Sequence, residues 1–179
     1  CLNPATGEQL AEFKLPNPTD DWGRIHVKDD LLIAVIFRTL DEDKEKLPDA
    51  RKLLAGQRSP VEIVALNRHE GTRIWSYEAD ASFPVISVGA DKVFCFDGAL
   101  ESFYQDWKRR GLLPKASDIR YLKAIDLQTG KEIWKEYAEI IGTWVSYSAE
   151  HDVLLLTNKE NIMAFRGNTG RVLWKQYAE

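Results

Sequence analysis

The chain has 179 residues, 44% of them hydrophobic, with 24 basic against 28 acidic side chains and a formal net charge of −4. A chain of this length can bury one sizeable core, and the composition is ordinary for a soluble globular protein. The mild negative charge argues against a nucleic-acid partner, and no apolar run approaches the ~20 residues of a membrane span.

In chain order, alternating apolar and polar residues predict a hairpin remnant followed by three groups of four antiparallel strands. The remnant is residues 1–15, around Gly7. The first group comprises 23–27, 31–37, 61–67 and 72–77, and the second comprises 85–88, 92–97, 121–126 and 131–137. The third has strands at 143–148 and 152–157 and a hairpin turning at Gly170. Tandem four-stranded units are typical of β-propeller blades.

A repeated pattern around four glycines carries this prediction. Gly71, Gly130 and Gly170 are each followed, four residues later, by a tryptophan, and these tryptophans are Trp75, Trp134 and Trp174. A glycine supplies the positive φ that closes a tight turn with a bulge, and Asp126 can accept hydrogen bonds from turn amides. At the first glycine, Gly7, the pattern degrades, because Ala11 stands where a tryptophan belongs.

The intervals between these glycines indicate two insertions. They are 64, 59 and 40 residues, and the shortest matches the ~40-residue period of common propeller repeats. The surplus in the longer two falls between the second and third strands of a group, at 38–60 and 98–119. The blades are therefore expected at 16–80, 81–140 and 141–179, after the end of a preceding blade at 1–15.

The segment 124–134, Ala-Ile-Asp-Leu-Gln-Thr-Gly-Lys-Glu-Ile-Trp, resembles the tryptophan-docking motif of pyrroloquinoline-quinone (PQQ) propellers. This superfamily includes quinoprotein dehydrogenases and the propeller lipoprotein of outer-membrane protein assembly. The resemblance implies that the three tryptophans stack between neighbouring blades against the next blade's turn. It also implies a ring of seven or eight blades, of which this chain is a segment, and a bacterial, periplasmic or extracellular location.

The chemistry of that superfamily is not visible in these residues. Its dehydrogenases hold calcium with carboxylate and amide ligands, and many place adjacent cysteines beside the quinone, whereas the two cysteines here are Cys1 and Cys95. Cys95 lies in an apolar run that predicts a buried thiol. The three histidines, His26, His69 and His151, lack metal-ligand spacing. No catalytic, cofactor-binding or metal-binding residue is therefore predicted, and no cofactor is expected in this segment.

The insertions suggest where a ligand would bind. In an antiparallel blade, both insertions leave on the same face, and loops of this length are uncommon unless functional or flexible. The second insertion predicts a helix over 99–110, with an aromatic stripe that either packs on the blade or rims a binding surface. Trp22 and Trp144, aligned at the starts of first strands, either pack between blades or stack on a ligand. The candidate ligand-face residues are Trp22, Trp144, Tyr104, Trp107 and Arg109.

The favoured function is a non-catalytic propeller segment that serves as a binding or assembly scaffold. Its partners would be the remaining blades, and a protein or a small saccharide-like ligand. One alternative is part of a PQQ-dependent dehydrogenase whose quinone and calcium ligands lie outside this segment. Another is a sensor or polymer-binding domain of a multidomain protein.

Overall fold

The computed structural model describes residues 2–3, 5–15, 17, 20–38, 61–79, 85–98, 108–111, 120–139 and 143–177. In this part of the chain, strands form three four-stranded antiparallel sheets, each with its strands in sequence order. The first sheet contains β1 (Asp21–Lys28), β2 (Leu31–Phe37), β3 (Val61–Asn67) and β4 (Arg73–Ala79). The second contains β5 (Val85–Val88), β6 (Lys92–Gly98), β7 (Arg120–Asp126) and β8 (Glu132–Tyr137). The third contains β9 (Trp144–Ser148), β10 (Val153–Thr157), β11 (Asn161–Arg166) and β12 (Val172–Tyr177).

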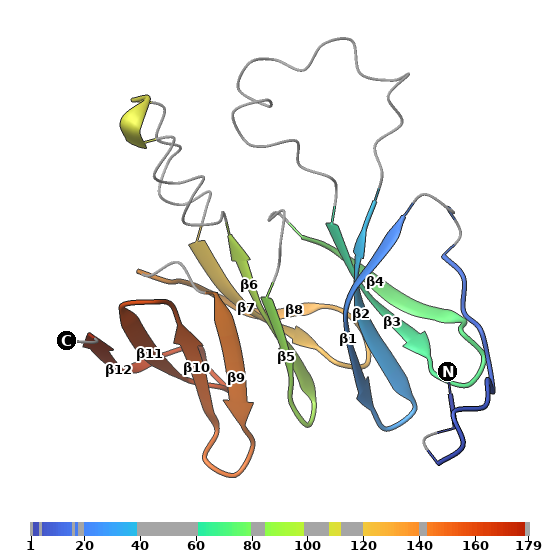
Figure 1. The fold of residues 1–179 in the computed structure, drawn as a ribbon. Coiled ribbons are helices and arrows are strands. Elements are labelled where there is room, and N and C mark those ends of the chain that lie inside the picture. The colour runs from blue at the N-terminus through green and yellow to red at the C-terminus, as the bar shows by residue number, and fades with distance from the viewer. Residues whose placement is uncertain are drawn as a thin grey trace.

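The sheets lie side by side like the blades of a fan (Figure 1). The first strands meet along the inner side, where β5 contacts both β1 and β9. Each sheet therefore presents one face to its predecessor and one to its successor. Below, the face toward lower residue numbers is called the leading face, and the opposite one the trailing face.

Apolar side chains fill the space between successive sheets. Between the first and second sheets, Ile33 and Ile63 meet Cys95 and Ile125, all with no exposed surface. Between the second and third sheets, Phe94 and Leu122 meet Leu154 and Phe165 in the same way. Because most side chains on both faces of β2 and β3 are buried, these strands read as almost unbroken apolar runs rather than as alternating ones.

The third and fourth strands of every sheet share one irregularity. The register shifts between Ala65 and Leu66 in the first sheet, and at the matching positions 124/125 and 164/165 in the others. The turn that follows ends in Gly71, Gly130 or Gly170, at φ of 70° to 72°. The glycine-closed, bulged hairpin expected from the repeat is thus present in all three sheets.

Candidate functional site

Two tryptophans join successive sheets in the same way. The Trp75 indole Nε1 donates to the Leu127 carbonyl at 2.9 Å, and Trp134 Nε1 donates to the Gly167 carbonyl at 2.9 Å. A Cβ built on Gly130 would lie 2.7 Å from the Trp75 ring. The glycine therefore supplies both the left-handed turn and the room for the indole.

The third tryptophan of the repeat has a different environment. The Trp134 ring lies against Gly170, where a Cβ would come within 2.7 Å of it. Trp174, by contrast, is 46% exposed on β12, at the outer edge of the third sheet. The structure thus brings Trp75 and Trp134 together with the next sheet's turn, whereas Trp174 is about half exposed.

On the leading face of the first sheet, Phe13 packs where a tryptophan packs on each of the next two sheets. A Cβ on Gly71 would lie 2.6 Å from the Phe13 ring, so Phe13 covers Gly71 as Trp75 covers Gly130. The repeat pattern missed it, because Phe13 follows its glycine by six residues instead of four. The feature of the sequence that could have revealed this contact is an aromatic residue two positions after Ala11, where the repeat has its tryptophan. Unlike an indole, the phenyl ring donates no hydrogen bond to the turn.

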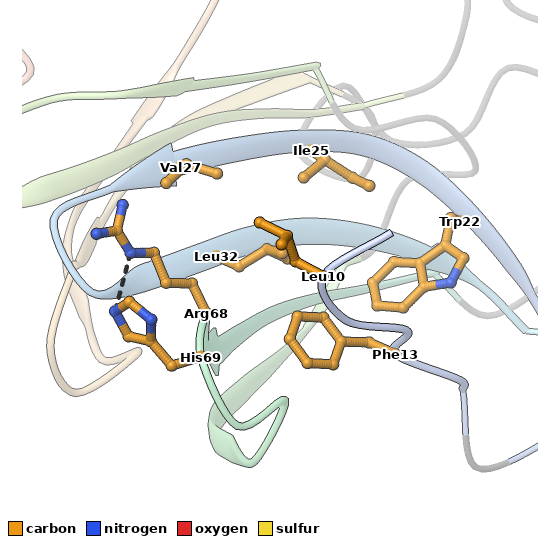
Figure 2. Close-up of a pocket in the computed structure, with 8 residues that line it drawn as sticks. All are labelled: Leu10, Phe13, Trp22, Ile25, Val27, Leu32, Arg68 and His69. Carbon is orange, nitrogen blue, oxygen red and sulfur yellow. Dashed lines mark hydrogen bonds between the residues drawn. The ribbon is translucent and has the colours of Figure 1, made fainter. Parts of the chain in front are cut away.

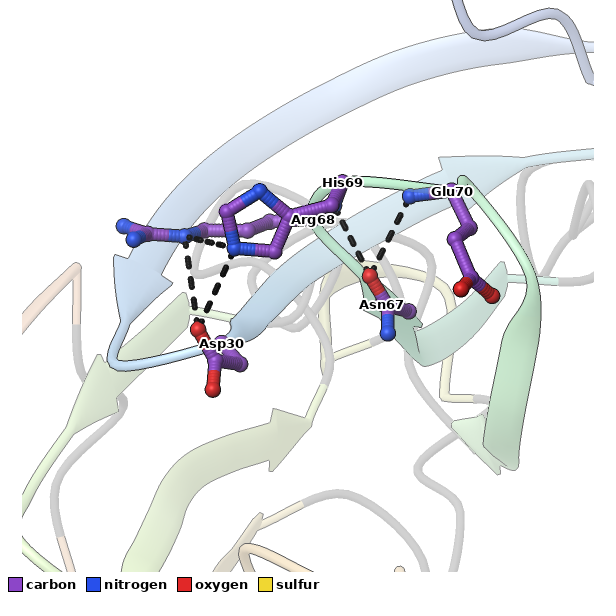
Figure 3. Close-up of polar contacts among 5 residues, drawn as sticks. All are labelled: Asp30, Asn67, Arg68, His69 and Glu70. Atoms are coloured by element: carbon purple, nitrogen blue, oxygen red, sulfur yellow. Dashed lines mark hydrogen bonds and ion pairs between the residues drawn. The ribbon is translucent and has the colours of Figure 1, made fainter.

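Asp126 holds the turn of the second sheet. Its Oδ1 accepts hydrogen bonds from the Thr129 amide at 2.7 Å, the Thr129 hydroxyl at 2.7 Å and the Gln128 amide at 3.1 Å. These donors, Thr129 above all, lower the pKa of the Asp126 carboxyl. Asn67 has the same role in the first sheet, where its Oδ1 accepts from the amides of His69 and Glu70 (Figure 3).

A buried polar cluster lies between the first and second sheets. Lys123 Nζ donates to Asp97 Oδ2 at 2.7 Å and to the Tyr77 hydroxyl at 2.9 Å. The side chains of Lys123 and Asp97 are 3% and 0% exposed. Burial raises the pKa of the Tyr77 phenol, and hydrogen bonding to Lys123 opposes that rise. The cluster links β4 to β6 and β7, so it joins the two sheets.

An apolar hollow of about 730 Å³ lies on the leading face of the first sheet, beside the segment 5–15. Leu10 and Phe13 of that segment face Trp22, Ile25, Val27 and Leu32 across it (Figure 2). Arg68 and His69 close one end. There, His69 Nε2 lies 3.2 Å from Asp30 Oδ1 and accepts from Arg68 Nε at 3.2 Å (Figure 3).

The candidate ligand-face residues do not gather in one place. Trp22 pairs with Ile36 and lines the hollow, whereas Trp144 pairs with Thr157 and is 48% exposed. A register shift between Trp22 and Ile25 adds one residue to β1. Trp22 and Trp144 are therefore not at equivalent positions of their sheets. A shift of one residue reverses the face, and Trp22 therefore lies on the leading face and Trp144 on the trailing face.

The predicted helix over 99–110 falls mostly outside the described residues, as do Tyr104, Trp107 and the whole of 39–60. Arg109 is described and exposed. Next to it, the Gly111 amide donates to the Lys108 carbonyl at 3.2 Å, and Gly111 has φ of 67°. The predicted helix itself stays a prediction.

The strand ends from which the two insertions leave lie at the same end of neighbouring sheets. These ends are Phe37 and Val61 in the first sheet, and Gly98 and Arg120 in the second (Figure 1). The first strand of each sheet also starts at this end, which places Trp144 there (Figure 1). This end of the fan is called the insertion end below.

The described part of the chain shows neither a metal-binding cluster nor a membrane-spanning helix. Within it, no group of three or more His, Cys, Asp or Glu side chains could hold a metal ion. Cys95 is a buried thiol, as its apolar surroundings predicted. Burial and the neighbouring Arg24 lower the pKa of His26. Among the same residues, no helix has the length and apolar character needed to cross a bilayer.

Comparison with known proteins defines the fold. Neither a scan of protein-family models nor a search of curated proteins gives a significant match. Among solved structures, the β-propeller domain of the Trilobed protease from Pyrococcus furiosus matches 89% of this chain at 14% identity and a TM-score of 0.54. The acylaminoacyl peptidase from Pyrococcus horikoshii matches 89% at 12% identity and a TM-score of 0.56.

Quinoprotein dehydrogenases, which the repeat resembles, are also among the matching structures. The quinohemoprotein alcohol dehydrogenase from Comamonas testosteroni matches 86% of this chain at 15% identity and a TM-score of 0.49. This chain spans only 43%, 25% and 20% of the three proteins, in the order given. Likeness at these identities is a likeness of fold. The chain is a segment of a β-propeller, as predicted, and each four-stranded sheet is one blade.

Proposed function

We propose that this propeller segment is a non-catalytic binding or assembly scaffold whose ligand face is the insertion end. The observation that carries the proposal is that both long insertions leave neighbouring blades at that one end (Figure 1). Loops of 20 or so residues on a rigid framework are a common place for binding residues. The third blade has only the short turn Asn158–Glu160 at the same position.

The framework beneath the insertion end supports this role. The blades are held together by apolar cores and by the Trp75 and Trp134 hydrogen bonds. Loops anchored on such a framework can vary in sequence without loss of the fold. Trp144, 48% exposed at this end, offers an aromatic face to a planar or sugar-like ligand.

The test shortens both insertions. Residues 39–60 and 99–119 are each replaced by Asn-Lys-Glu, the turn that joins β10 to β11. Thermal shifts are then measured for the parent and shortened chains against a panel of oligosaccharides and peptides. We expect the shortened chain to keep its melting temperature to within a few degrees and to lose the ligand that the parent binds.

A point variant provides the second readout. Trp144→Ala is expected to weaken binding of the same ligand while lowering stability by less than about 1 kcal/mol, because the side chain is half exposed. Binding that survives both changes would refute the proposal. Dye reduction with an alcohol after addition of PQQ and calcium would refute it in favour of a dehydrogenase.

A further inference from the structure

The leading face of the first blade is uncovered at positions that the next two blades bury. Ile25 pairs with Ala34, Ile86 with Cys95, and Val145 with Leu156, and the three pairs occupy equivalent places in their sheets. Ile86 and Val145 are 2% and 4% exposed, because the preceding blade packs on them, whereas Ile25 is 51% exposed. Val27, on the same face, is 58% exposed.

The segment 2–15 covers only the outer half of this face. Leu2 bridges Gln9, and the Gly7 amide donates to the Asn3 carbonyl at 2.8 Å, as the Gly71 amide donates to that of Asn67. Gly7 has φ of 72°, like the closing glycines of the three blades. The segment therefore has the turn of a blade's outer hairpin, and its Phe13 ring lies against Gly71 of the first blade. The hollow lies closer to the inner side of the fan than this segment does, over β1 and β2.

We propose that a two-stranded β-hairpin of the same propeller occupies the hollow. This hairpin would be the inner half of the blade whose outer half is residues 2–15. Its alternate apolar side chains would pack on Ile25, Val27 and Leu32, as Leu31, Ile33 and Val35 of β2 pack on the second blade. The hairpin would thereby complete, on the leading face of the first blade, the same kind of interface that the first blade forms with the second.

The charged end of the hollow fits the same occupant. Arg68 and His69 lie at the end of the fan where β1 turns into β2 (Figure 2). Both side chains are paired there with Asp30 of the turn between β1 and β2, and the turn of an inner hairpin would lie at the same end of its blade. The inference does not depend on any ligand at the insertion end.

The test supplies the hairpin and measures whether it covers Ile25. A copy of residues 143–163, which hold β9, β10 and the start of β11, is placed directly ahead of residue 1. Residue 1 has the repeat position of Ala164, so the joint keeps the natural spacing. Ile25→Cys is labelled with a maleimide in a Cys1→Ser background, since Cys95 is buried.

We expect the graft to slow labelling at position 25 by at least ~10-fold, because labelling would then require local opening of the blade. Ile133→Cys, on β8 and 46% exposed in the parent, should react at the same rate with and without the graft. A graft carrying Leu155→Asp, which puts a charge on the packing face, should restore labelling at position 25.

Two results would overturn the inference. One is unchanged labelling of Ile25→Cys in the grafted chain. The other is protection of the same residue in the ungrafted chain that increases with protein concentration, accompanied by dimers in sedimentation velocity. That second outcome would assign the hollow to another copy of the chain.

Discussion

Replacement of Gly130 by alanine tests whether the joint between the first and second blades depends on a glycine. Gly130 has φ of 70°, a conformation that costs an L-residue ~1–2 kcal/mol. The added Cβ would also lie 2.7 Å from the Trp75 ring, and forcing extra volume into a packed site costs ~1–3 kcal/mol. The expected loss is therefore about 2–5 kcal/mol. For a chain of this size it corresponds to a fall in Tm of roughly 5–15 °C.

The assay is urea unfolding followed by circular dichroism, in two backgrounds. With Trp75→Leu in place, the ring is absent, so Gly130→Ala should cost only the backbone share of ~1–2 kcal/mol. Gly7→Ala is the matched control, since Gly7 has φ of 72° but nothing within 4 Å of its added Cβ. An equal cost of Gly130→Ala in both backgrounds would refute the packing argument and leave only backbone strain.

Three further outcomes are expected. Lys123→Met leaves the Asp97 carboxylate buried without its ammonium partner and should cost ~3–5 kcal/mol in urea unfolding, most of it recovered when Asp97→Leu is added. The raised pKa of Tyr77 means that the folded state retains the phenol proton longer than the unfolded state, so stability should fall as pH rises above about 10. Tyr77→Phe should lessen this fall, and an identical pH profile would contradict the assignment. Phe13→Trp should add a hydrogen bond to the Arg68 carbonyl, worth ~0.5–1.5 kcal/mol, and slow proteolysis within residues 2–15, with Phe13→Ala accelerating it.

The sequence predicted the repeating parts of this protein because they are set by local chemistry. A glycine with positive φ and alternating strands fix each hairpin within about ten residues, and in the first two hairpins Asn67 or Asp126 also accepts hydrogen bonds from the turn amides. The hairpins around Gly71, Gly130 and Gly170 were therefore located correctly. Trp75 and Trp134 also lie against the next blade's turn, since identical units stacked in tandem repeat the same contact.

Only the tertiary structure decided which side chains meet across blades where the repeat is broken. Phe13 takes a tryptophan's place from two residues further along, and one extra residue in β1 sends Trp22 to the opposite face from Trp144. Lys123 and Tyr77 are 46 residues apart in the chain, yet they form a hydrogen bond between blades. Such contacts depend on the strand register and on the packing of distant segments, which no local pattern specifies. The uncovered face at Ile25 became visible for the same reason, through comparison with the equivalent buried positions in three dimensions.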